Sequence, residues 1–293
     1  MEIPRGKGMF VWQFGRLGTP DQVADRALKS GLDWIGMKAQ NGVLLSDGRS
    51  EATFNNQVPN IKTGIVYTPE DYVKALRSIG VKMHGWGYVY GIESIVLKEA
   101  DVTKRAIDRF EFESWMVDAE YEYKTSGARM ASRYMGNLRL SLKNYIFGIS
   151  TYRFPTLHRD FPFGPFVDSC DYASPQVYWE KAHNPTAQLK RSLDEYRDLR
   201  SGWQIVPAGS AYTTGAWTPE VKELDGFYNA VIANKLDAWL WWEWYYLNLF
   251  PAWWDAITAH KSTVKKDDSG AGDVTQPDVQ KTDSQMISEV YPW

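Results

Sequence analysis

The amino-acid sequence predicts an α/β fold, a single closed (β/α)8 barrel of the TIM type followed by a short polar C-terminal tail. Two observations predict it. Short runs with the composition of strands recur along the 293-residue chain, and most of them precede a stretch with helical periodicity. Similar helix-start signals recur as well, which is typical of repeated βα units that close into a parallel barrel.

Eight short runs are rich in the β-branched and aromatic residues that favour strands. Eight strands that alternate with helices are the number that closes a parallel barrel. The predicted strands are residues 9–15, 32–38, 81–87, 114–120, 145–151, 171–178, 203–209 and 237–243.

The helices between these strands are marked by their start and stop signals. Thr, Pro and an acidic residue follow one another at residues 19–21, 68–70 and 218–220. Each triplet offers a capping hydroxyl, a proline at the first helical position and an acid in the first turn. Asn184 and Pro185 open another helix, and a glycine follows the end of two helices, at Gly31 and Gly80.

Residues 1–261 are predicted to form one domain, the barrel, and residues 262–293 a flexible or partner-docking tail. Beyond residue 260 the composition changes to Lys, Asp, Ser, Gly, Thr and Gln, which is typical of segments without a packed core. The last residues of the tail are apolar enough to dock onto an assembly partner. Two long insertions, residues 40–67 and 152–168, follow predicted strands and therefore belong to the carboxyl rim, where barrel enzymes build their sites.

The composition argues against several classes of protein. The 33 basic and 36 acidic residues give a net charge of −3 without a basic stripe, which argues against nucleic-acid binding. The most apolar stretch, residues 236–254, contains charged residues and a proline, so no membrane span is expected. The single cysteine, Cys170, excludes an intrachain disulfide. The histidines lack metal-ligand spacing and no glycine-rich motif fits a nucleotide, so neither a metal nor a cofactor is expected.

The first residues of the chain contain no apolar core of the signal-peptide type. We therefore expect the protein to be cytoplasmic when it is synthesised. For any action outside the cell we expect release by lysis or carriage on a phage-like particle.

Tryptophan is unusually frequent, with 14 Trp beside 17 Tyr. An indole N–H needs a hydrogen-bond partner, so Trp is costly in an ordinary core. Flat aromatic rings are also platforms on which the C–H faces of sugars stack. The count fits either a saccharide site or a large core that happens to use Trp.

Asp118 and Glu120 are the sharpest chemical feature of the sequence. Residues two apart in a strand point to the same side, so both acids are expected to face the barrel mouth at the carboxyl end of their strand. Neighbouring charge and burial both raise the pKa of a carboxyl group, and a Glu with a raised pKa is a competent general acid near neutral pH. The alternative is that both acids lie in a solvated loop or pair with nearby Lys or Arg.

Side chains from other strand ends are expected to converge on the same mouth. A pocket of carboxylates, amides, a tyrosine and indoles suits a saccharide better than a phosphate or a planar cofactor. Ordinary alternatives exist, because His84 fits a hydrogen-bonded core histidine and Glu243 can pair with Lys38 across the barrel. The expected mouth residues are Trp12 or Gln13, Lys38, Gln40, His84, Trp86, Tyr88, Ser174, Gln176, Tyr178, Trp179, Trp239, Trp241 and Glu243, with Trp242 in the opposite phase.

Three short motifs resemble those of glycoside-hydrolase barrels, namely the family 25 lysozymes and, more distantly, the family 18 chitinases. They are Asp-Ala-Glu at residues 118–120, Pro-Gln-Val-Tyr-Trp at 175–179 and Trp-Trp-Glu-Trp at 241–244. The resemblance implies that Glu120 protonates the glycosidic oxygen. It also implies that Asp118 orients the substrate's acetamido group or stabilises the positive intermediate formed when that group attacks, and that Tyr178 supports the acetamido group.

The sequence also departs from both families. Family 25 lysozymes carry an acid on the first strand, where this chain has Trp12 and Gln13, and Met116 interrupts the family 18 run of acids. Glu243 belongs to neither pattern. It is a candidate for a second catalytic carboxylate that faces Glu120.

These residues predict a glycosidase that hydrolyses an N-acetylated polysaccharide, peptidoglycan ahead of chitin. The alternative is a non-catalytic carbohydrate-binding or structural barrel, for example a component of a phage or phage-like particle. An enzyme needs Glu120 to face an open groove, whereas a binding protein can have it locked to Lys38 or an arginine. The predicted catalytic residues are Asp118, Glu120 and Glu243, and the predicted substrate-binding residues are Trp12, Lys38, Trp86, Gln176, Tyr178, Trp179 and Trp242.

Overall fold

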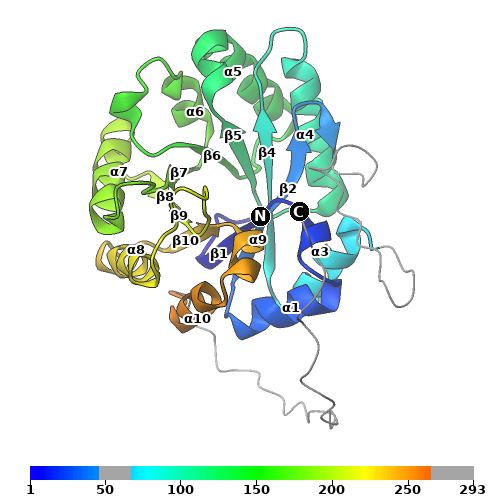
Figure 1. Ribbon diagram of the computed structural model, residues 1–293. Coiled ribbons are helices and arrows are strands. Elements are labelled where there is room, and N and C mark those ends of the chain that lie inside the picture. Colours follow the sequence, from blue (N-terminus) through cyan, green and yellow to red (C-terminus); the bar gives the residue numbers. More distant parts are fainter. Residues whose placement is uncertain (46–66, 265–293) are drawn as a thin grey trace.

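The computed structural model describes residues 1–45 and 67–264 and shows a closed parallel barrel surrounded by helices (Figure 1). Strand β1 pairs in parallel with β2 on one side and with β10 on the other, and these pairings close the barrel. The short strand β3 forms an antiparallel hairpin with β2. The strands are β1 (Gly6–Val11), β2 (Trp34–Asn41), β3 (Leu44–Leu45), β4 (Lys82–Val89), β5 (Trp115–Ala119), β6 (Phe147–Tyr152), β7 (Tyr172–Val177), β8 (Gln204–Ile205), β9 (Ala208–Ser210) and β10 (Ala238–Trp242).

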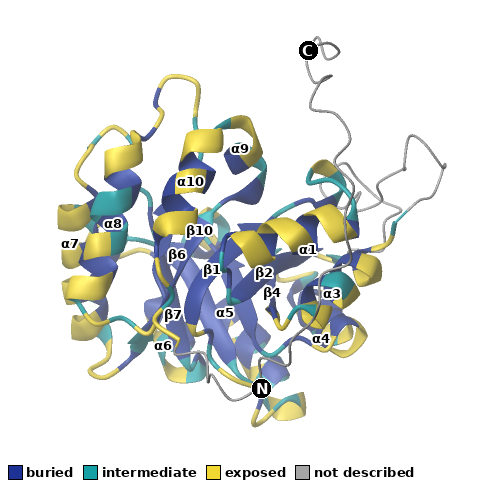
Figure 2. Cartoon of the chain, turned by 90° about the horizontal axis from the view of Figure 1, so that it is seen from below, coloured by how far each residue is buried: buried dark blue, intermediate teal, exposed yellow. Residues whose placement is uncertain are grey.

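The helices form a ring around the barrel and present their polar faces outward, so that buried strands lie inside an exposed shell (Figure 2). Within the described residues no helix combines the length and the apolarity needed to span a membrane. The helices are α1 (Pro20–Lys29), α3 (Pro69–Ser78), α4 (Val96–Phe110), α5 (Tyr121–Ser141), α6 (Phe163–Ser169), α7 (Pro185–Leu199), α8 (Val221–Ala233), α9 (Trp244–Leu249) and α10 (Pro251–Ala259), with 3-10 turns at Phe14–Arg16 and Pro155–Leu157.

The predicted barrel is confirmed, with local differences among its strands. The first strand ends at Val11, and a 3-10 turn begins at Phe14, within the predicted run. The seventh predicted strand is divided into β8 and β9 around Pro207, which has no N–H to give to a ladder. The division of the chain at residue 261 stays a prediction. Most of the insertion at 40–67 and of the tail lies outside the described residues.

Two of the three predicted helix caps are confirmed. Thr19 and Thr68 begin α1 and α3, each in a reciprocal capping box with the residue three positions later. Helix α8 begins later than expected, because Glu220 is its N-cap and pairs with Glu223. Thr218 bonds instead to the hydroxyl of Thr213, at 2.7 Å.

The lower barrel interior is filled by side chains, and glycines make room for them. A Cβ at Gly8 would lie 2.1 Å from the Trp34 indole, so the ring can lie across the barrel only because β1 has glycine there. His84 lies beside Trp34, its Nδ1 2.8 Å from the hydroxyl of Ser114, and burial lowers its pKa to about 3. His84 is therefore a neutral, hydrogen-bonded core histidine, which is the alternative that the sequence analysis gave for this residue.

Lys7 points outward from β1 and fastens the last helix to the barrel. Its buried ammonium donates to the carbonyl of Ile257 at 2.8 Å and to that of His260, at the end of α10. We expect Lys7→Met to lower the free energy of unfolding by about 3 kcal/mol, because both carbonyls lose a charged donor in a buried place. Urea denaturation measures this. Lys29→Met, which removes only an exposed pair with Asp25, should leave it unchanged, and equal loss in both variants would contradict the expectation.

Candidate active site

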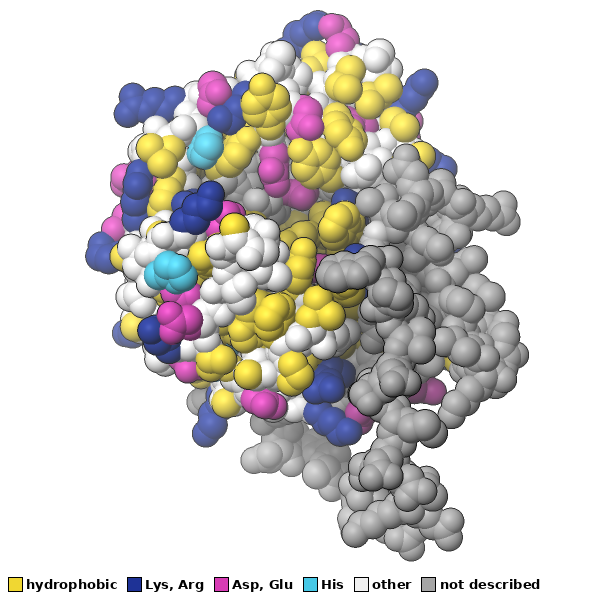
Figure 3. Space-filling model, in the orientation of Figure 1, with side chains coloured by type: hydrophobic (Ala, Val, Ile, Leu, Met, Phe, Trp, Pro, Cys, Tyr) yellow, Lys and Arg dark blue, Asp and Glu magenta, His cyan; other side chains and the backbone are white. Residues whose placement is uncertain are grey.

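The carboxyl ends of the strands surround a pocket of about 380 Å³. The space-filling view shows a hollow near the centre of the face, with hydrophobic and acidic side chains gathered around it (Figure 3). This end of the barrel is where (β/α)8 enzymes build their sites. The lining residues are Phe10, Trp12, Lys38, Trp86, Tyr88, Asp118, Glu120, Ser150, Gln176, Tyr178, Tyr212 and Trp242.

Asp118 and Glu120 lie side by side in this pocket, held by one amide. Asp118 is the next-to-last residue of β5, and Glu120 follows the strand at the start of α5. The side-chain nitrogen of Gln176, on β7, donates to Asp118 Oδ1 at 3.0 Å and to Glu120 Oε1 at 2.9 Å. A third oxygen, the hydroxyl of Ser150, lies 3.4 Å from the same nitrogen. The amide therefore fixes the spacing and orientation of the two carboxyl groups.

Burial is the main influence on the protonation of both acids. It raises the pKa of Asp118 well above its usual range, and the neighbouring charge of Glu120 raises it further. Burial also raises the pKa of Glu120, against the opposing effects of the Gln176 hydrogen bond and the Lys38 charge. A Glu120 that keeps its proton at higher pH than a free side chain can act as a proton donor.

Lys38 supplies a positive charge to the pocket wall. Its ammonium lies 5.3 Å from the ring centre of Trp12 and 4.9 Å from that of Trp86. Burial lowers the pKa of Lys38 to about 8, although the charges of Asp118 and Glu120 act in the opposite direction. The lysine is thus a cation between two indole faces, close enough to both acids to influence their charge.

Indole rings form one side of the pocket. Trp242, the last residue of β10, is stacked with Trp12 at 6.4 Å and meets Trp86 edge-on at 5.5 Å. Trp12 and Trp242 are only partly buried, so part of their ring surface faces the pocket. These rings offer the apolar platform that a sugar ring requires.

Several lining residues were missed by the sequence interpretation. Tyr212 lies edge-on to Tyr178 at 5.4 Å and follows the end of β9, so the break at Pro207 concealed its position at a strand end. Ser150 faces inward on β6, and the alternation of that strand would have identified it. Glu122, in the same acidic run as Glu120, does not line the pocket, but it accepts a hydrogen bond from the lining residue Tyr88 at 2.6 Å.

Two predicted site residues lie elsewhere. Trp179 is fully buried and stacks on Phe227 of α8 at 5.5 Å, because it is one residue out of phase with Gln176 and Tyr178 and faces the helices. Glu243 is 2% exposed and does not line the pocket; its Oε2 accepts from the backbone N–H of Trp12 at 3.3 Å. Burial raises the pKa of Glu243 to about 7. It is placed behind the pocket wall rather than opposite Glu120.

Two further expectations about side-chain direction are wrong. Trp239 and Trp241 face the helix layer, where they contact Tyr228 and Phe227 of α8, and Trp242 faces inward instead. On β2 the register shifts between Lys38 and Gln40, and this β-bulge turns Gln40 away from the mouth. The Gln40 amide donates to the carbonyls of Gly42 and Glu99 instead.

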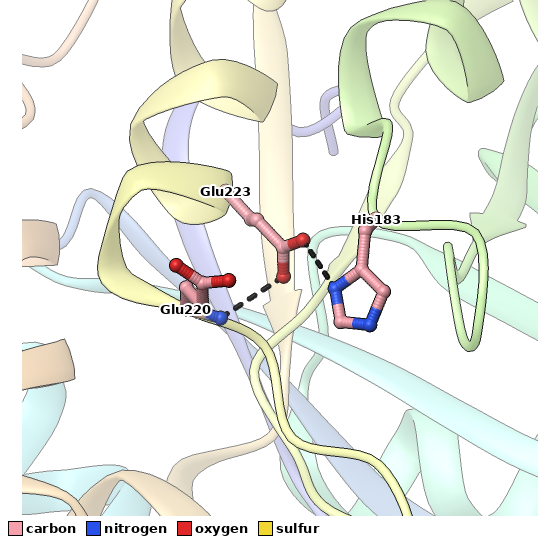
Figure 4. Close-up of side chains that lie close together, drawn as sticks. All are labelled: His183, Glu220 and Glu223. Carbon is pink, nitrogen blue, oxygen red and sulfur yellow. Dashed lines mark hydrogen bonds and ion pairs between the residues drawn. The ribbon is translucent and has the colours of Figure 1, made fainter.

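A second titratable cluster lies outside the pocket, where His183, Glu220 and Glu223 meet at the start of α8 (Figure 4). The ligand atoms of these side chains are all within 4.8 Å of one another, which sequence spacing did not reveal. Glu223 is already engaged, because Oε1 lies 2.6 Å from His183 Nδ1 and Oε2 accepts from the Glu220 backbone at 2.9 Å. Lys222 lies 2.7 Å from the Glu220 carboxylate. These contacts hold the loop after β7 against the start of helix α8.

No protein-family model matches the chain, and no sequence among the curated proteins does either. Solved structures of the same shape do exist. The spore cortex-lytic enzyme SleL of Bacillus megaterium has 8% identity over 88% of this chain and 74% of its own, with a TM-score of 0.59. A chitinase domain from Pyrococcus furiosus has 11% identity over 87% of this chain and 96% of its own, with a TM-score of 0.60. The PgaB (BpsB) glycoside hydrolase domain of Bordetella bronchiseptica has 8% identity over 89% of this chain and 100% of its own, also with 0.60.

At these identities the likeness establishes the fold. The presence of chitinases agrees with the resemblance to family 18, whereas the resemblance to family 25 lysozymes stays a prediction. The chain therefore has the (β/α)8 barrel found in these glycoside hydrolases.

Proposed function

We propose that the protein is a glycosidase that hydrolyses a polysaccharide of N-acetylated sugars. The observation that carries the proposal is the pair Asp118 and Glu120, joined by the Gln176 amide in an open pocket at the carboxyl rim. Barrels of the same shape belong to proteins described as chitinases, as a spore cortex-lytic enzyme and as a glycoside hydrolase domain. Those descriptions support the reaction class that the paired acids suggest.

In the proposed reaction Glu120 gives its proton to the glycosidic oxygen, and the bond from that oxygen to the sugar carbon breaks. Positive charge develops on the sugar, and Asp118 stabilises it directly or orients an acetamido group that attacks the same carbon. Water then completes the hydrolysis, and its proton restores Glu120. Tyr178 lines the same pocket, and its hydroxyl is proposed to support the acetamido group.

The proposed substrate is peptidoglycan ahead of chitin. Both polymers offer a sugar face for Trp12 and Trp242 and an acetamido group for the Asp118 side of the pocket. The decisive experiment is incubation of the purified protein with peptidoglycan and with soluble chitin oligomers, followed by mass spectrometry. New reducing ends identify the linkage that is cut, and intact polymers in both incubations would refute the proposal.

A non-catalytic carbohydrate-binding barrel is the second candidate. One observation favours it: Gln176 engages both carboxyl groups and the Lys38 charge lies close to them, an arrangement that also suits a fixed binding site. Retained binding of either polymer without new ends would select this function.

The proposed acid predicts the direction of the pH dependence. Because burial raises the pKa of Glu120, the proton donor stays loaded at higher pH than a free Glu, and activity should fall as pH rises through that raised pKa. Lys38, with a pKa of about 8, loses its charge on the same alkaline side. Initial rates of oligomer cleavage between pH 4 and 10 measure the profile. A rate that rises steadily toward alkaline pH would contradict the role of Glu120.

A further inference from the structure

A second hollow, of about 510 Å³, lies beside the pocket. The two share a wall, because the Glu122 side chain lines the second hollow and accepts the hydrogen bond of Tyr88, which lines the first. The ring of Tyr88 also meets that of Tyr90, on the far side, edge-on at 5.2 Å. The residues around the second hollow are Tyr90, Ile92, Glu93, Tyr121, Glu122, Thr125, Ser126, Arg129 and Met130.

The beginning of helix α5 is shaped to form this wall. Gly127 has φ +69° and ψ −170°, which interrupts the helix and sets the segment before it apart from the rest. Glycine adopts this left-handed backbone without a steric penalty. Within the segment the Ser126 hydroxyl donates to the carbonyl of Glu122 at 3.1 Å. The residue after the proposed acid, Tyr121, is thereby carried on a short turn at the edge of the hollow.

The surface of the hollow combines apolar side chains with charged and hydroxyl groups, as a sugar combines C–H faces with hydroxyl groups. Tyr121 is 70% exposed and Ile92 is 50% exposed, so a ring face and an aliphatic side chain are open to solvent. Arg129 and Glu93 form an ion pair at 2.6 Å on the same surface. Apolar faces beside charged and hydroxyl groups match the C–H faces and hydroxyl groups of a saccharide.

We propose that this hollow binds the stretch of polysaccharide adjacent to the sugars that react, with Tyr121 as its stacking platform. The inference rests on the proposed function. It adds that the protein binds an extended segment of the polysaccharide rather than only the sugars at its end. The two hollows lie on either side of the Tyr88–Glu122 contact, so one polysaccharide chain that crosses this contact can occupy both. Binding energy from the second hollow then holds the polymer across the reacting centre.

The test compares short and long ligands in a Glu120→Gln background, where binding is measured without cleavage. Disaccharides and hexasaccharides of peptidoglycan and of chitin are titrated by calorimetry into that variant and into the same variant carrying Tyr121→Ala. We expect the hexasaccharide to bind about tenfold more weakly after the second change, while disaccharide affinity stays the same. Tyr121→Trp should restore the affinity. Leu140→Ala, which alters an 87% exposed residue elsewhere on α5, is the matched control.

The outcomes separate the two proposals. If the Glu120→Gln protein binds hexasaccharides equally well with Tyr121 and with Ala at that position, the second hollow is not a sugar site and the proposed function stands. If it binds no oligosaccharide of either polymer at either length, the proposed function fails and this inference fails with it. Circular dichroism confirms that each variant is folded before binding is measured.

Discussion

Glu120→Gln is expected to lower the rate of glycan cleavage by about 10²–10⁴-fold, the contribution typical of a positioned general acid. Glutamine has the size of glutamate and keeps an oxygen that can accept the Gln176 hydrogen bond, so the pocket should retain its shape. It carries no proton that the glycosidic oxygen can take. Mass spectrometry of timed digests gives the rate, and calorimetry with the same oligomers should show binding near that of the wild type.

The Glu120→Gln measurement needs a control variant that removes a carboxylate far from the pocket. Glu111→Gln supplies it, because that side chain is 83% exposed at the end of α4. Its digestion rate should equal that of the wild type. Equal cleavage by the wild type and by Glu120→Gln would show that the acid is another residue, and Glu243→Gln would be the next variant, since burial raises the pKa of Glu243 to about 7.

Strand alternation predicted most of the pocket. It placed Asp118 and Glu120 on one side of β5 and Gln176 on the facing side of β7, and the structure joins all three by hydrogen bonds. These positions were predictable because each strand end has a local period of two, which requires no knowledge of the neighbouring strand.

The errors occur where contacts with an adjacent strand, rather than local sequence, determine which way a side chain points. Gln40 turns outward because β2 bulges against β4, a matter of register between two strands. The phase of β10 was ambiguous, since Trp239, Trp241 and Trp242 are all aromatic and a strand covered on both faces shows no polar alternation. Glu243 follows that strand, and only its contact with the Trp12 backbone shows that it lies behind the wall.

Tertiary contacts also determine which acidic residues become buried and which partners they have. In the sequence Glu223 is an acidic residue in the first turn of a helix. In the structure it is buried, and its carboxylate contacts the backbone N–H of Glu220 and the ring of His183, from the loop after β7. A residue 40 positions away in sequence therefore determines its environment, and no local pattern could reveal it.

Asp118→Asn is expected to lower kcat by about 10²–10³-fold, the cost of losing one preorganised group that faces developing charge. Asparagine keeps an oxygen for the Gln176 amide but has no carboxyl group that can ionise as positive charge develops on the sugar. KM should change little, because the charge matters in the transition state more than in the bound ground state. Steady-state kinetics on chitin oligomers or peptidoglycan fragments separates the two parameters.

The same substitution should leave the protein at least as stable as the wild type. In the folded state Asp118 is buried next to Glu120, which raises its pKa and makes its charged form costly, so a neutral side chain of equal size relieves that cost. Asp194→Asn, on the exposed side of α7, is the control for both measurements. Lost activity with retained thermal stability would mean that the chain keeps an unfavourable buried charge for catalysis. Unchanged kcat, or activity lost together with stability, would contradict the role given to Asp118.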